Sequence, residues 1–111
     1  MNVQFSVNAG ICGFMTKAAA NCEDGQFVEL VIESPCEKIQ ALAKSLEEAG
    51  TIDAFQEISP AGESVILSTA RATLKGCCAG CVVPVALFKS MQVAAGLALP
   101  SDISISMAKE P

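Results

Sequence analysis

Cysteine is the residue type in this chain best suited to chemistry, and six cysteines occur in 111 residues. Three of them, Cys77, Cys78 and Cys81, lie within five residues and are followed by Pro84 and a long apolar segment. A loop that enters a helix in this way brings sulfur atoms close together. Cys78 and Cys81 have the spacing C-x-x-C, in which two thiolates can bind one zinc ion or adjacent irons of an iron–sulfur cluster. The stretch therefore predicts a thiolate site.

Two cysteines earlier in the chain are the other candidate ligands. Cys12 lies in a segment with two glycines, which permit backbone angles that other residues resist, so we expect a tight loop that presents its thiol. Cys36 follows Ser-Pro at a predicted helix start, where unpaired backbone N–H groups and the helix dipole favour a thiolate. We therefore predict that Cys12, Cys36, Cys78 and Cys81 hold an iron–sulfur cluster or a zinc ion.

The remaining two cysteines are weaker candidates. Cys22 lies alone on an alanine-rich predicted strand, and free cysteine is often buried as a small hydrophobic side chain, so we expect it in the core. Cys77 is adjacent to Cys78, and the two side chains diverge if the loop is extended. We expect one of the two to join Cys81 and choose Cys78, with Cys77 as the alternative.

Composition limits the chemistry and the partners of this chain. Histidine is absent, which excludes mixed Cys/His zinc sites, a histidine general base and histidine-activated thiols. Twelve acidic and seven basic residues give a net charge of -5, which opposes binding to nucleic acid. The first residues show no sign of an export signal, so we expect a cytoplasmic protein whose cysteines bind metal or do thiol chemistry rather than form disulfides.

Apolar and polar residues alternate in three segments near the N-terminus. This alternation predicts strands at residues 2–8, 15–22 and 27–33. An Asp-Gly turn separates the last two strands, as is typical of a hairpin. The first third of the chain is therefore predicted to be a three-stranded meander.

Helix signals follow this meander. Ser34 as the N-cap, Pro35 at the first helical position and Glu37 completing a capping box predict a helix that ends at Ala49, before Gly50. We expect three further helices, the first of them short, at residues 51–58, 63–74 and 85–99.

The last helical segment is apolar enough to raise the question of a membrane span. Lys89 lies near its middle, where a charge in a bilayer would cost roughly 2.5 to 3.5 kcal/mol, and Pro84 interrupts the apolar run. We expect a core helix and no membrane partner.

The C-terminal residues complete the predicted fold. Ile103, Ile105 and Met107 alternate with serine and alanine, which predicts a terminal strand. A hydrophobic fraction of 51% is sufficient for one core, so we expect a single domain over residues 1–111. The predicted fold class is α+β, a two-layer sandwich of about four mainly antiparallel strands with helices packed on one face.

Four segments resemble a small, functionally uncharacterised family of cysteine-containing proteins found mainly in anaerobic microbes. They are NAGICGF at residues 8–14, SPC at 34–36, CVVP at 81–84 and KSMQVAAGLALPSD at 89–102. The resemblance implies that Cys12, Cys36 and Cys81 are the family-type cysteines, and that Cys78 is an addition in this member, as are Cys22 and Cys77. A site of three thiolates with an open or borrowed fourth position fits this implied pattern better than a site of four cysteines.

Three functions remain open at this point. The first is a metal or iron–sulfur protein in electron transfer, cluster carriage or regulation, with a redox or cluster-accepting protein partner or a second subunit of the same chain. The second is a thiol-disulfide or sulfur-transfer protein in which Cys36 or Cys78 attacks and Cys81 resolves. The third is an interaction module with structural cysteines. The resemblance offers no enzyme activity to carry over, so whether the protein is an enzyme stays open.

Overall fold

Alternating side chains produce three long strands in the first third of the chain, as predicted. The computed structural model describes residues 1–110, and its first elements are β1 (Asn2–Asn8), β2 (Met15–Cys22) and β3 (Phe27–Glu33). β1 pairs antiparallel with β2, which places Phe5 opposite Ala18. β2 pairs antiparallel with β3, which places Ala20 opposite Leu30. The predicted meander is confirmed.

The fourth strand does not come from the predicted segment. β4 (Ile52–Asp53) pairs antiparallel with β3, and the strand order is β1-β2-β3-β4. The predicted C-terminal strand is wrong, because residues 101–110 contain no strand and the side chains of Ile103, Ile105 and Met107 are exposed. Alternation makes a segment able to form a strand, but its backbone groups must also meet a neighbouring edge. This segment meets none within the described chain.

The first helix, α1 (Glu37–Ala49), begins later than the capping signal predicts. Its N-cap is Cys36, and Ser34 lies outside the helix with Pro35, so the predicted capping box is wrong. The Ser34 hydroxyl instead accepts hydrogen bonds from the Cys36 backbone N–H (3.2 Å) and from the Thr16 hydroxyl (2.9 Å). These contacts join the helix entry to β2. The end of α1 agrees with prediction, with Gly50 at a φ of 85°.

Residues 51–58 form β4 and one short helix, α2 (Ala54–Glu57), rather than a helix throughout. The Asp53 carboxylate caps α2 by accepting hydrogen bonds from the backbone N–H groups of Phe55 and Gln56. Ile52 is buried, whereas Phe55 and Ile58 are exposed, so these three apolar residues do not share one buried face.

The next helix, α3 (Val65–Thr73), confirms the predicted helix at residues 63–74. Its first turn is held by Glu57, a carboxylate that is only 5% exposed. Glu57 accepts hydrogen bonds from the Ser64 hydroxyl (2.8 Å), the Val65 N–H (2.6 Å) and the Ile66 N–H (2.8 Å). This buried carboxylate therefore fixes α2 against α3.

A short 3-10 helix, η1 (Gly76–Gly80), leads into the last helix, α4 (Val83–Ala94). α4 begins and ends earlier than predicted. Pro84 lies in its first turn, where its missing N–H costs nothing, and the chain leaves the helix before Gly96, which has a φ of 77°. Leu87 and Met91 are fully buried, which agrees with a core helix.

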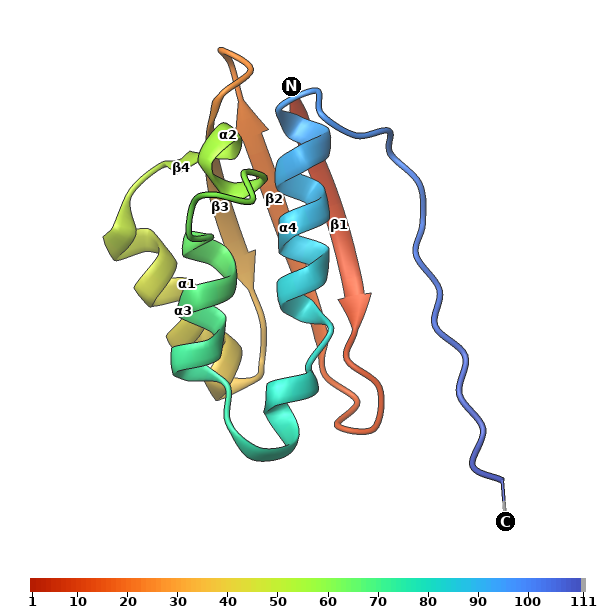
Figure 1. Cartoon of the computed structure of the whole chain (residues 1–111). Helices are drawn as coiled ribbons and strands as arrows, with labels where there is room; N and C mark the ends of the chain where they lie inside the picture. Colours follow the sequence, from red (N-terminus) through yellow and green to blue (C-terminus); the bar gives the residue numbers. More distant parts are fainter. Residues whose placement is uncertain (111) are drawn as a thin grey trace.

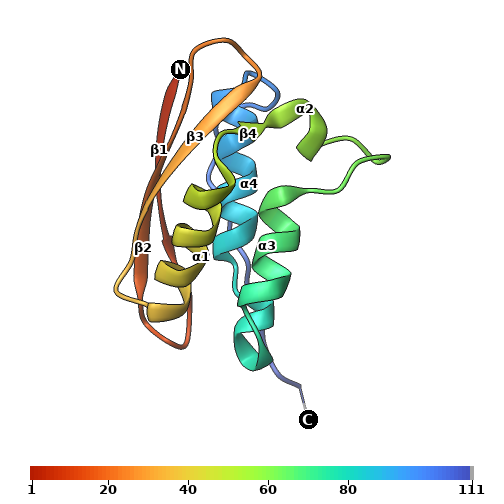
Figure 2. The same cartoon turned by 90° about the vertical axis from the view of Figure 1, so that its left-hand side faces the viewer.

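The helices cover one face of the sheet (Figures 1 and 2). α4 packs against β1 and β2, α1 packs against β3, and α3 contacts both α1 and α4. The predicted α+β class and the one-sided arrangement of helices are confirmed. Residues 76–94 are the one helical stretch in residues 1–110 that is long and apolar enough to span a membrane, and its α4 part forms the core of this sandwich.

Candidate thiolate site

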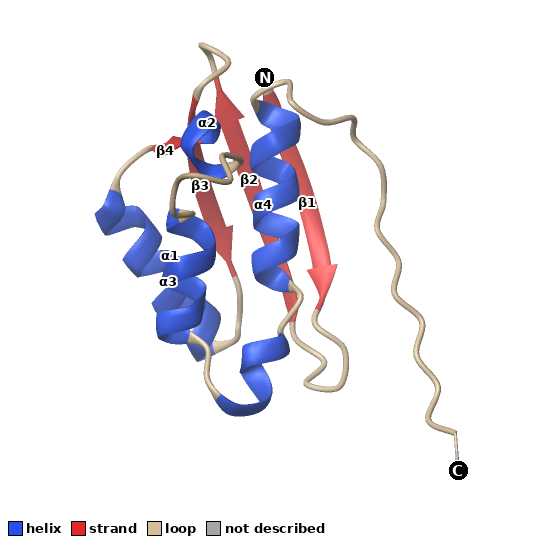
Figure 3. Ribbon diagram, viewed as in Figure 1, coloured by secondary structure: helices blue, strands red, loops and turns tan. Residues whose placement is uncertain are grey.

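Three segments that are distant in the sequence meet at one end of the molecule. β1 and β3 run in the same direction because each is antiparallel to β2, so the loops that follow them lie at the same end of the sheet. These loops are residues 9–14 and the entry to α1. η1 lies at this end too, at the bottom of Figures 1 and 3, and the view in Figure 2 agrees. Cys12, Cys36, Cys78 and Cys81 belong to these segments or directly follow them.

Cys12 lies in a tight loop, as predicted. Gly10 and Gly13 have φ angles of 93° and 73°, a region that favours glycine. The Gly13 N–H donates a hydrogen bond to the Gly10 carbonyl (2.9 Å), and the Gly10 N–H donates one to the Asn8 side chain (3.0 Å). These bonds close the loop on itself, and they leave Cys12 and Ile11 exposed at its tip.

Cys78 and Cys81 lie in a single turn. The Cys81 N–H donates a hydrogen bond to the Cys78 carbonyl (3.1 Å), and the Cys78 N–H donates one to the Lys75 carbonyl (3.2 Å). The first of these bonds closes the C-x-x-C segment into a compact turn. Cys36 occupies the N-cap of α1, so it lies at a helix N-terminus as expected, although its side chain makes no capping hydrogen bond.

The six cysteines differ in their surroundings. Cys36, Cys78 and Cys81 are partly buried and pack against the hydrophobic core. Cys77 is exposed, so the two adjacent side chains have different environments and Cys78 is the one that faces the core. Cys22 is 3% exposed within the core, at the far end of β2 from the Cys12 loop.

Electrostatics link the four candidate ligands. Burial is the largest cause that raises the pKa of the Cys81 thiol, and a hydrogen bond with the Val83 backbone opposes it. The thiols of Cys12, Cys36 and Cys78 raise the pKa of Cys81 further, because negative charges on neighbouring sulfurs repel one another. Such repulsion is strong only over roughly 10 Å or less. This agrees with the topology, which brings the segments of all four cysteines to one end of the sheet (Figure 2).

The segments that carry these cysteines lie at one end of the sheet, but they do not form a ready metal site. Within residues 1–110, no three or more Cys, Asp or Glu side chains are arranged to hold a metal ion. A bound ion would require the sulfur atoms to turn toward one point. Cys78 and Cys81 lie on one turn, whereas Cys12 lies exposed at the tip of a separate loop.

One group at the site, and one buried carboxylate at the opposite end of α3 (Figure 2), had no clear signal in the sequence. The Val83 backbone N–H interacts with Cys81 because α4 starts earlier than the apolar pattern indicates. The Glu57 carboxylate is buried in the helical layer, and its hydrogen bonds to the start of α3 give it a structural role. Its position between Gln56 and Ile58 resembles that of an exposed helical residue, so no pattern could have identified it.

The fold and the site together define a small α+β protein with a cluster of free thiols at one end of an antiparallel sheet. The chain belongs to a family of unknown function, DUF6951, whose sequence profile matches residues 3–107. This match includes all six cysteines. No curated protein and no solved structure matches the chain.

Proposed function

We propose that this chain is a small metal-binding protein whose thiolates hold an iron–sulfur cluster or a zinc ion. The ligands are Cys12, Cys36, Cys78 and Cys81. The observation that carries the proposal is that the three separate segments bearing these four residues meet at one end of the sheet (Figure 2). Core packing alone does not require thiols from three segments at one place, because small hydrophobic side chains would serve equally well.

Charge supports a bound cation at this end of the molecule. Burial raises the pKa of Cys81, and repulsion from neighbouring sulfurs adds to this effect, so Cys81 keeps its proton when nothing else is bound. A metal ion replaces these protons and neutralises the charge on the sulfurs, so its binding releases protons. The absence of histidine makes an all-thiolate site the natural donor set, and such sites hold zinc or iron–sulfur clusters.

Either four or three of these thiols act as ligands. Cys36, Cys78 and Cys81 lie on elements that pack against the core, whereas Cys12 lies on an exposed loop. A three-thiolate form, in which Cys12, Cys36 and Cys81 bind and Cys78 is dispensable, corresponds to the family-type pattern described above. In that form the fourth position is left to water, to a substrate or to a partner protein.

The setting that fits this proposal is a cytoplasmic protein of an anaerobic microbe, where a cluster exposed near the surface survives. The partner that we propose is a redox protein or a protein that accepts a cluster, since Cys12 lies at an exposed tip. A net charge of -5 argues against nucleic acid as the partner.

A second candidate function is thiol-disulfide exchange, favoured by the hydrogen bond that closes the turn between Cys78 and Cys81. In this reaction the Cys78 thiolate attacks a disulfide of a substrate and displaces one substrate thiolate. Cys81 then attacks the Cys78 sulfur of the mixed disulfide, releases the second substrate thiol and leaves a Cys78–Cys81 disulfide. The raised pKa of Cys81 slows the second step at neutral pH.

Anaerobic purification, followed by an absorption spectrum and by iron, zinc and sulfide analysis of one sample, tests the proposal. A brown protein with iron and sulfide supports the cluster, and a colourless protein with about one zinc per chain supports the zinc site. A protein that holds neither metal, even after reconstitution with iron and sulfide or with zinc, contradicts the proposal. Thiol-disulfide exchange then becomes the leading function.

A further inference from the structure

One edge of the sheet is open and unprotected. β1 is the outer strand on one side, while the other outer strand, β4, is only two residues long. Proteins usually protect an edge strand with charged residues, proline or short length. β1 has seven residues, NVQFSVN, without a charge or a proline. Its outer backbone N–H and C=O groups are therefore available to another strand.

The C-terminal segment has the pattern of such a strand but no partner in its own chain. Ile103, Ile105 and Met107 are 54%, 65% and 90% exposed and alternate with small residues. No backbone hydrogen bond joins residues 101–110 to the remainder of the described chain. The family match extends through residue 107, so this segment belongs to the family sequence and is not an unrelated tail.

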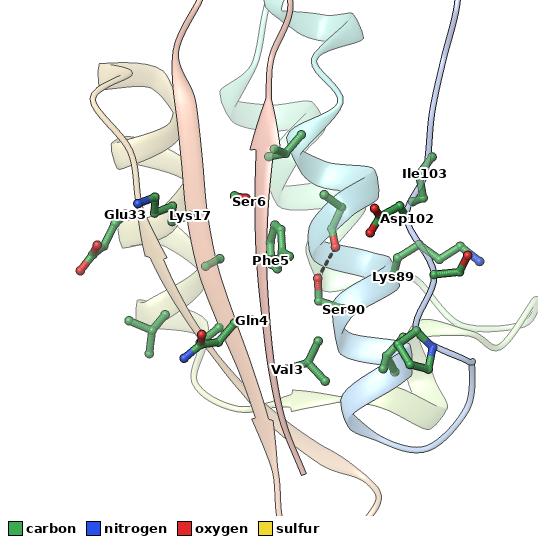
Figure 4. Close-up of a pocket in the computed structure, with 18 residues that line it drawn as sticks. Val3, Gln4, Phe5, Ser6, Lys17, Glu33, Lys89, Ser90, Asp102 and Ile103 are labelled. Carbon is green, nitrogen blue, oxygen red and sulfur yellow. Dashed lines mark hydrogen bonds between the residues drawn. The ribbon is translucent and has the colours of Figure 1, made fainter.

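A groove lies beside β1 where an added strand would fit (Figure 4). Its volume is about 990 Å³, and it is lined by β1 together with residues of β2 and β3, by α4 and by the first residues of the C-terminal segment. Val3 and Phe5 lie on the β1 side, and Lys89 and Val93 lie on the α4 side. A strand next to β1 would extend the sheet and place its apolar residues against α4.

The direction of the C-terminal segment determines which copy it fits. Residues 101–110 run in the same direction as β1 and lead away from the body of the molecule (Figures 1 and 3). Pairing with the same chain would therefore be parallel. In a second copy related by a two-fold axis normal to the sheet, β1 runs the opposite way. Pairing would then be antiparallel, like every other pair in this sheet, and the antiparallel ladder is the more stable one.

We propose that residues 103–107 form a strand on β1 of a second copy of this chain. The exchange is reciprocal, so each copy contributes its segment to the other and both open edges are satisfied in a two-fold symmetric dimer. Ile103, Ile105 and Met107 of each copy become buried under the partner's α4. This interface lies along the side of the sheet and is independent of the thiolate site.

The molar mass of the reduced protein, measured by sedimentation over a dilution series, tests the exchange. Excess reductant removes intermolecular disulfides, and the wild-type chain should have twice its mass of 11.4 kDa. Ile105→Lys places a charge in the apolar strip of both copies and should raise the dimer Kd by about a hundredfold or more. Ser104→Lys, on the opposite face of the same segment, is the matched control and should remain dimeric.

Hydrogen exchange of the backbone amides of residues 103–107 supplies a second measurement, and circular dichroism checks that both variants are folded. Protected amides in a dimer support the exchange. A monomeric wild-type chain, with or without protected amides, overturns it, as does a dimer that tolerates Ile105→Lys. A dimer in which these amides exchange freely overturns it too.

Discussion

Cys22 and Cys81 place the same side chain in two different environments at opposite ends of one fold. Cys22 lies among buried apolar residues at the end of β2, and its thiol donates a hydrogen bond to the Asp24 carboxylate (3.7 Å). Cys81 is only partly buried and interacts with three other thiols. The depth of burial and the neighbouring side chains, rather than the residue type, distinguish a packing cysteine from a candidate ligand.

The largest expected difference between the two ends is in metal content. Cys36→Ser should remove most of the bound metal, because a serine hydroxyl is not ionised at neutral pH and replaces a thiolate poorly. Cys22→Ser should leave metal content nearly unchanged. Metal analysis of the two variants, purified together with the wild-type chain under anaerobic conditions, checks this. Equal metal content in the two variants would contradict the assignment of the site.

The free energy of unfolding of the metal-free protein should be lowered most by substitution of Cys22, which has little effect on metal content. Cys22→Ser puts a hydroxyl into a site that is 3% exposed, and we expect the metal-free protein to lose about 1–3 kcal/mol in its free energy of unfolding. Urea unfolding of metal-free protein measures this loss. Cys77→Ser is the matched control at an exposed position, where a change within about 0.5 kcal/mol is expected. A similar loss in both variants would show that Cys22 has no special packing role.

The number of thiolate ligands determines whether Cys12 and Cys78 both contribute to metal affinity. In a four-thiolate site, Cys12→Ser and Cys78→Ser each lower metal affinity by about tenfold or more, the scale seen when even supporting groups of a metal site are removed. In the three-thiolate form, Cys12→Ser alone has this effect. Competition with a coloured zinc chelator measures both affinities. Cys77→Ser again serves as the control, and a loss of affinity in it would move the ligand from Cys78 to Cys77.

The smallest expected effect is a pH dependence of metal-free protein. The pKa of Cys81 is raised above the ordinary value of 9.0, so the folded state retains this proton to higher pH than the unfolded state does. The resulting contribution to stability is complete below pH 9.0 and is lost as pH rises through the folded-state pKa. Above pH 9.0, the free energy of unfolding measured in urea should therefore fall less steeply with rising pH for Cys81→Ala than for the wild-type chain. Identical slopes would contradict the raised pKa.

The sequence predicted the strands and most of the candidate site from local patterns. Alternation in residues 2–8, 15–22 and 27–33 depends only on which face is buried, so it identified all three strands. Glycines around Cys12 and the spacing of Cys78 and Cys81 are equally local, and the structure has the tight loop and the turn that they indicate.

Features that depend on distant contacts were not predictable in the same way. Ser34 carries a strong capping signal, but its hydroxyl bonds Thr16 on β2, and Cys36 becomes the N-cap instead. Ile52 joins the sheet because β3 offers an edge there, although a helix begins two residues later, at Ala54. Residues 103–107 show the opposite case, since a strand pattern has no edge to join within the described chain.

The shared direction of β1 and β3 has a consequence for how the protein opens. An ion bound at the end of these two strands would tie the Cys12 loop, the entry of α1 and the turn before α4 into one closed ring of chain. An ion that binds only to the folded state raises the free energy of every local opening that separates the side chains holding it. Loss of the ion would therefore lower the free energy of opening at this end and make the Cys12 loop and the entry of α1 more accessible to proteases.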